Sequence, residues 1–110
     1  MSKIAKINLL SRSIDILLVD TTDASDLIAD FTYNSGVANY ERNLITIEKR
    51  HDAFVTLLHE IAHFWLQLTG QYYAESYNRE MVVEFFGRLA TQLILENGED
   101  IFKKLKLFCE

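Results

Sequence analysis

The chain has no proline, four glycines and a single cysteine among its 110 residues. Because Cys109 has no partner in the chain, an internal disulfide is excluded, and a reducing compartment such as the cytoplasm is expected. No apolar run reaches the ~18 residues that a membrane span needs. The apolar runs near the N-terminus are too short and too interrupted for a signal peptide. The sequence therefore predicts a cytoplasmic protein with no membrane partner.

Basic residues are also scarce, with 11 lysines and arginines against 16 aspartates and glutamates and a net charge of −5. A nucleic-acid-binding protein presents clustered basic side chains to phosphates, whereas this chain has only one short lysine run, at residues 103–106. Nucleic acid is thus not expected as a partner. Apolar residues are abundant at 49%. That is enough for one hydrophobic core, so we predict a single domain over residues 1–110.

The N-terminal half has the alternating pattern of β-strands. Residues 3–10 and 13–19 predict two short strands, and residues 37–40 and 44–48 predict a hairpin. A short helical turn is expected at residues 27–29, and Gly36 belongs to a turn that precedes the hairpin.

From Asp52 onward the apolar period becomes helical. Asp52 is a plausible N-cap and Gly70 a plausible C-terminal stop for the first helix. A second helix is expected from residue 78 or 79 to residue 97, followed by a short helix over 99–108. The predicted fold class is therefore α+β. A small N-terminal sheet within residues 3–48 packs on the first helix, and a second core helix and a short C-terminal helix follow.

The first helix contains the motif His59-Glu60-Ile61-Ala62-His63. Residues four apart lie on one face of a helix, so both imidazoles project to the same side. Two neutral imidazoles at this spacing can share one Zn²⁺, and Glu60 can reach a water on that metal. Polar side chains on a helix with so many apolar positions are costly unless something satisfies them, and a metal with its water would do so.

Catalytic zinc usually takes three protein ligands. The remaining histidine, His51, precedes the helix and is expected to be a solvated residue. A carboxylate on the next segment is the better source of a third ligand, which leaves Glu75, Glu80 and Glu84.

Glu84 is favoured among these three because it lies among apolar neighbours inside the second helix. Gly87, one turn later, would let that helix approach the histidine helix closely. An ion pair with Arg88 is the alternative explanation of Glu84. Glu80 and Glu75 stay open as alternatives.

These segments together resemble the minimal phage and prophage members of the ImmA/IrrE-type zinc metallopeptidases, a gluzincin-like group with a zincin-like fold. The matching segments are Ile-Thr-Ile at residues 45–47, Thr-Leu-Leu-His-Glu-Ile-Ala-His at 56–63, Glu-Phe-Phe-Gly at 84–87 and Gln-Leu-Ile-Leu-Glu-Asn at 92–97. The resemblance covers most of residues 34–97. The chain departs from the family's pattern at Gly87 and Arg88, where larger relatives prefer Ala-Asn. It also lacks the Leu-Leu-Met-Pro-like continuation of the family.

The resemblance implies zinc held by His59, His63 and Glu84, with Glu60 as general base. It also implies an intracellular bacterial or phage protein, and in some relatives the cleavage of a repressor. The departures imply that the substrate-binding part is reduced or different. The expected substrate is a peptide or protein.

The chemistry expected of such a site is peptide hydrolysis. Zinc would lower the pKa of its bound water towards ~7, and Glu60 would take the proton and pass it to the leaving amine. Tyr72, Tyr73 and Tyr77 are candidates for stabilising the oxyanion, although packing at a loop edge is the commoner role of such tyrosines. The alternative function is a metal-binding module, weak or inactive as an enzyme, that acts by binding a host or phage protein.

Overall fold

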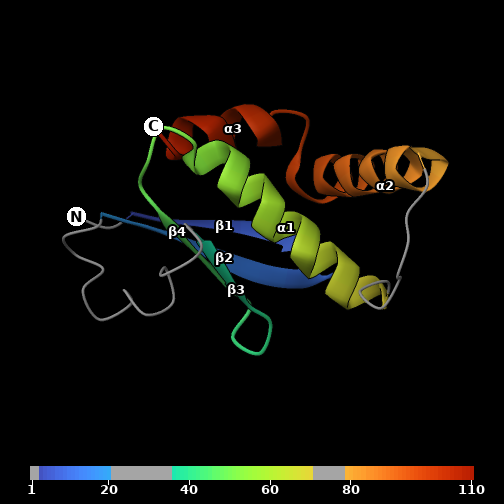
Figure 1. The fold of residues 1–110 in the computed structure, drawn as a ribbon, viewed down its shortest axis with the longest axis horizontal. Helices are drawn as coiled ribbons and strands as arrows, with labels where there is room; N and C mark the ends of the chain where they lie inside the picture. The colour runs from blue at the N-terminus through green and yellow to red at the C-terminus, as the bar shows by residue number, and fades with distance from the viewer. Residues whose placement is uncertain (1–2, 21–35, 71–78) are drawn as a thin grey trace.

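The computed structural model describes residues 3–20, 36–70 and 79–110, and of residues 79–81 only the backbone. It is an α+β fold with a four-stranded sheet followed by three helices, which confirms the predicted class (Figure 1). The elements are β1 (Lys3–Leu9), β2 (Arg12–Val19), β3 (Gly36–Asn39), β4 (Leu44–Glu48), α1 (Ala53–Thr69), α2 (Arg79–Asn97) and α3 (Ile101–Phe108). The helical turn expected at residues 27–29 lies outside the described residues.

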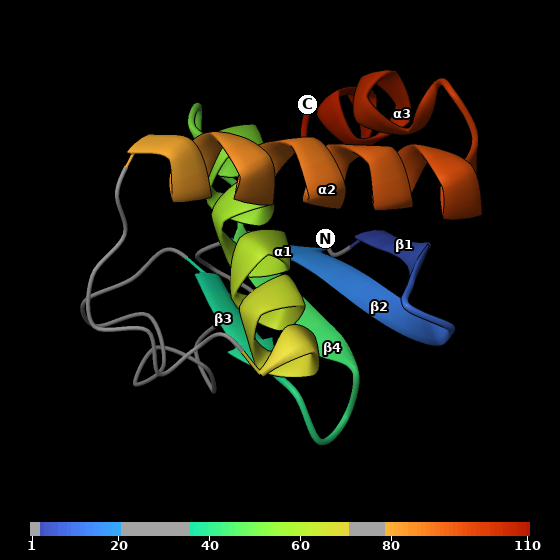
Figure 2. The same cartoon turned by 90° about the vertical axis from the view of Figure 1, so that its right-hand side faces the viewer.

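The strand order is β1-β2-β4-β3, with antiparallel pairing at both ends of the sheet. The two central strands, β2 and β4, are parallel, and their register runs from Asp15 opposite Leu44 to Val19 opposite Glu48. Within the described part of the chain, β3 pairs with β4 alone and forms one edge of the sheet. This edge lies beside α1 (Figure 2).

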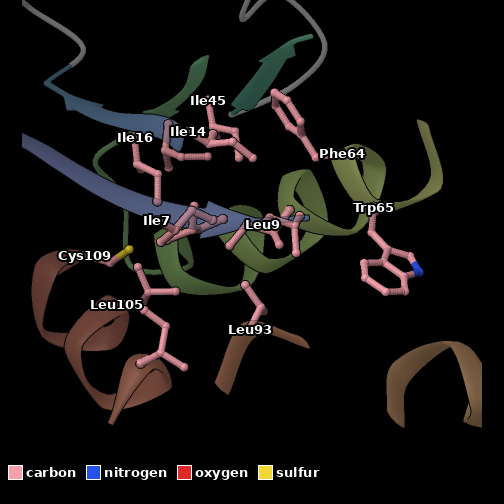
Figure 3. Packing of buried hydrophobic residues seen from close by; sticks show 14 of the residues in the cluster. Ile7, Leu9, Ile14, Ile16, Ile45, Phe64, Trp65, Leu93, Leu105 and Cys109 are labelled. Carbon is pink, nitrogen blue, oxygen red and sulfur yellow. The ribbon is translucent and has the colours of Figure 1, made fainter. Parts of the chain in front are cut away.

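All three helices lie on the same face of the sheet (Figure 1). α1 packs on β3 and β4, whereas α2 packs on β1. The alternation of β2 and β4 turns their isoleucines toward the helices, and these side chains are almost fully buried. Leu93 of α2 and Leu105 of α3 lie close to Ile7 and Leu9 of β1, so one hydrophobic cluster connects the sheet with the helices (Figure 3).

The helix ends follow the predictions except at the N-terminus of α3. Gly70 ends α1 in the left-handed conformation with φ 74°, and its N–H bonds the carbonyls of Gln67 and Leu66, as expected of a C-terminal glycine. Asp52 occupies the N-cap position, as predicted, and its side chain makes no capping hydrogen bond. α3 begins at Ile101 rather than Glu99.

The C-terminal end of α2 is tied to the turn between β1 and β2. Leu10 and Ser11 both have positive φ, at 50° and 65°. The Glu96 carboxylate accepts the N–H of Leu10 at 2.6 Å and that of Ser11 at 2.9 Å. The amide of Asn97 donates to the Asn8 carbonyl at 2.7 Å. These bonds hold the last turn of α2 over the sheet, while its first turns extend beyond it (Figure 2).

Of the helices described, none combines the length and the apolar character needed to cross a lipid bilayer.

Candidate metal centre

α1 presents two faces of opposite character. Leu57, Ile61 and Phe64 have no exposed surface and pack against the sheet. His59 and His63 lie on the solvent side of the same helix. The burial of its apolar face against the sheet fixes the orientation of α1, and both imidazoles on the opposite face are therefore exposed to solvent.

The two imidazoles converge. Their Nε2 atoms are 3.0 Å apart, and the rings meet edge to face with centroids 4.6 Å apart at 76°. Two nitrogens that each lie ~2.0–2.1 Å from one tetrahedral Zn²⁺ would be about 3.3 Å apart. The pair therefore fits a shared metal ion with little adjustment. Without a metal, the same distance permits a hydrogen bond in which one imidazole donates to the other.

Glu60 completes a group of three side chains whose ligand atoms all lie within 4.8 Å of one another. It differs from its neighbours in being buried, at 8% exposure, and it is the one buried charged side chain among the described residues. A carboxylate at this distance can be linked to the imidazoles through one water molecule. The structure therefore brings together His59, Glu60 and His63, as the motif predicted.

β3 supports Glu60 from the side of the sheet. A Cβ built on Gly36 would lie 2.8 Å from Thr56 Cγ2, 3.0 Å from Ile47 Cδ1 and 3.2 Å from Glu60 Cγ. The sequence pattern assigned Gly36 to a turn, whereas the structure places it as the first residue of β3. The glycine is needed here because the edge strand and α1 approach too closely for any side chain.

Tyr40, which follows β3, is a neighbour of the site that the sequence reasoning missed. Its ring packs edge to face on Phe64, with centroids 5.0 Å apart at 73°. Burial raises the pKa of Tyr40, and the negative charge of Glu60 raises it further. The predicted tyrosines, Tyr72, Tyr73 and Tyr77, lie outside the described residues. The predicted hairpin was the one sequence signal that could have pointed to Tyr40, because nothing in the local sequence links this residue to α1.

Glu84 is not part of this group. Its side chain is 61% exposed and pairs with Arg88, whose Nε lies 3.0 Å from Glu84 Oε1. This is the ion pair that the sequence offered as the alternative explanation. A ligand role for Glu84 remains a prediction that would require it to leave Arg88.

The argument from Gly87 is wrong. A Cβ at Gly87 would meet no atom of α1, because nothing lies within 4 Å of that position. The glycine therefore does not mark a close crossing of the two helices. Of the other predicted ligands, His51 is exposed in the turn before α1. Glu75 and the side chain of Glu80 lie outside the described part of the chain.

Comparison with known proteins finds no family model, no curated protein and no solved structure that matches this chain.

Proposed function

We propose that this chain is a zinc-dependent peptidase in which His59 and His63 hold the metal and Glu60 is the general base. One observation carries the proposal: two imidazole nitrogens converge to 3.0 Å beside a buried carboxylate. All three groups lie within 4.8 Å of one another. The proposal also draws on the resemblance to the ImmA/IrrE-type peptidases, which favours a bacterial or phage regulatory protease. The lone cysteine, Cys109, is buried and suits a reducing compartment.

The chemistry divides between the metal and the carboxylate. Bound zinc would supply Lewis acidity, which polarises a peptide carbonyl and lowers the pKa of water. Glu60 accepts the proton from the attacking water and returns it to the leaving amine. The burial of Glu60 against β3 holds the carboxylate in one position for both transfers.

The edge strand beside the site suits an extended substrate. Within the described residues, the side of β3 that faces away from β4 has no strand partner. A peptide can pair with such an edge through its backbone groups. Because Gly36 of β3 lies against Glu60, a peptide along this edge would pass the histidine pair.

The test begins with the metal. Protein purified without chelator should contain about one zinc per chain. His59→Ala and His63→Ala should lose it, and His51→Ala is the matched control that should keep it. Absence of zinc, with no uptake on addition, would contradict the proposal.

Hydrolysis is the second part of the test. A mixture of peptides with randomised sequences should be cleaved by the zinc-loaded chain and left intact by Glu60→Gln, with products identified by mass spectrometry. A protein that holds zinc and cleaves nothing would instead be a metal-binding module.

A further inference from the structure

The histidine pair has a second flank, opposite Glu60. Successive residues of a helix are about 100° apart around its axis. Viewed down the axis, Leu66 therefore lies about 20° from His59 in one direction, and Glu60 lies about 100° from His59 in the other direction. Leu66 is also three residues after His63, a spacing that puts the two Cβ atoms about 5–6 Å apart. The candidate metal centre thus lies between Glu60 with β3 on one side and Leu66 on the other.

At Leu66 the surface is hollowed by a pocket of about 170 Å³ between α1 and α2, lined by Leu66, Val82, Phe85 and Phe86. All four lining side chains are apolar. Two of them stay open to solvent, Val82 at 40% and Phe86 at 61% exposure. Exposed apolar side chains gathered in this way mark a binding surface more often than isolated ones do.

The size of the pocket limits what can occupy it. Sites for whole small molecules measure roughly 300–1,000 Å³. A volume of about 170 Å³ is too small for these and suits one apolar amino-acid side chain. Consecutive Cα atoms of a peptide are ~3.8 Å apart. A residue next to a peptide bond held at His63 can therefore reach a pocket that begins one helical turn away.

We infer that the pocket formed by Leu66, Val82, Phe85 and Phe86 receives a large apolar side chain of the substrate, next to the bond that is cleaved. The inference rests on the proposed function and extends it to substrate choice. The preference for large over small side chains comes from the burial of apolar surface, because the binding free energy becomes more favourable as the buried apolar area grows.

Binding of peptidyl hydroxamates to the zinc-loaded chain tests this inference without requiring hydrolysis. Two series of these compounds would be measured by calorimetry. Each series places glycine, alanine, leucine or phenylalanine next to the zinc-binding group, on its N-terminal side in the first series and on its C-terminal side in the second. In one series leucine or phenylalanine should bind at least ~10-fold more tightly than glycine. Val82→Trp, which fills the pocket, should remove that preference.

Val83→Trp is the matched control, because Val83 is the next residue of α2, is 68% exposed and does not line the pocket. It should keep the preference. Phe86→Ala should instead widen the pocket and improve binding of a tryptophan side chain. Circular dichroism would verify that each variant is folded.

The outcomes separate the two proposals. If the glycine hydroxamate itself does not bind, the metal site fails and the pocket inference fails with it. If all side chains bind equally, or Val82→Trp keeps the preference, the pocket inference alone is overturned. A dimer broken by Val82→Trp, together with equal hydroxamate affinities, would assign the pocket to a second copy and also overturn it.

Discussion

Single residues divide the candidate site into two exposed histidines, the proposed ligands, and one buried glutamate, the proposed base. His59 and His63 face solvent, where an ion can reach them, while Glu60 is held at 8% exposure beside β3. A mobile carboxylate would lose the geometry that proton transfer requires, since a general base acts only within hydrogen-bond reach or through one water. The difference in burial therefore matches the difference in proposed roles.

Glu60→Gln tests this division. The substitution keeps the size of the side chain but cannot accept a proton, so hydrolysis should fall at least ~100-fold. Zinc content and the thermal midpoint should stay close to those of the parent protein. The measurements are peptide turnover, elemental analysis and circular dichroism, with His51→Gln as control. Turnover equal to that of the parent would remove Glu60 as the base.

Glu96 is the residue whose titration should affect stability. Desolvation by burial acts to raise its pKa, but hydrogen bonds from the Ser11 N–H, the Gln92 side chain and the Leu10 N–H outweigh it and lower the pKa. A carboxylate with a lowered pKa in the folded state stabilises the fold above its unfolded-state pKa. This contribution is lost as the pH falls through the folded-state value.

Glu96→Gln should therefore destabilise the chain by about 0.5–1.5 kcal/mol at pH 7, because the carboxylate is partly solvated and the glutamine oxygen can still accept hydrogen bonds. The difference from the parent should shrink as the pH is lowered below the ordinary glutamate pKa of ~4.3. Urea denaturation at pH 7 and at several acidic values measures both quantities. Glu99→Gln, an exposed residue after α2, is the control. A pH-independent difference would contradict the assignment.

Among the elements, β3 is the one in which an added side chain at a glycine has the least room. Its first residue, Gly36, leaves no room for a Cβ against Thr56 Cγ2 at 2.8 Å, and Thr56 is β-branched and cannot easily turn aside. Gly36→Ala should therefore push β3 away from α1 and destabilise the chain by about 1–3 kcal/mol. Hydrolysis should fall while zinc binding by the histidines persists. Gly87→Ala, where nothing lies within 4 Å, is the control. Equal stability of the two variants would contradict the close packing.

The role of Glu84 of α2 as a third ligand is a prediction that can be tested. In the structure Glu84 pairs with Arg88 in the open, and exposed ion pairs contribute at most ~1 kcal/mol. Because catalytic zinc prefers three protein ligands, we expect Glu84→Ala to weaken zinc binding at least ~10-fold. Arg88→Ala, which frees the carboxylate, should not weaken it. Competition with a zinc-sensitive dye measures both affinities. Unchanged affinity in Glu84→Ala would assign the third position to another residue.

At the scale of the whole molecule, the metal should stabilise the folded chain. A ligand that binds only the folded state stabilises it by about 2.7 kcal/mol at 100 times its Kd. For a chain of 110 residues this corresponds to a rise in Tm of about 10 °C. Differential scanning calorimetry with and without zinc should show the rise in the parent protein. The same rise in His59→Ala would place the zinc elsewhere.

The sequence by itself determined the elements and the motif, because both depend on local periodicity. Alternation at residues 13–19 and 44–48 predicted β2 and β4, and the helical period from Asp52 predicted α1. The spacing of His59 and His63 needed nothing but a helix to bring both imidazoles to one side. The structure confirms these features.

Only the tertiary structure decided what surrounds the motif. The parallel pairing of β2 with β4, the contact of Gly36 with Glu60 and the packing of Tyr40 on Phe64 join segments that are distant in the chain. The same holds for the position of α2, which leaves Glu84 outside the group formed by His59, Glu60 and His63 among the described residues. Such placements depend on many contacts between residues far apart in the sequence, and these contacts cannot be predicted from local periodicity.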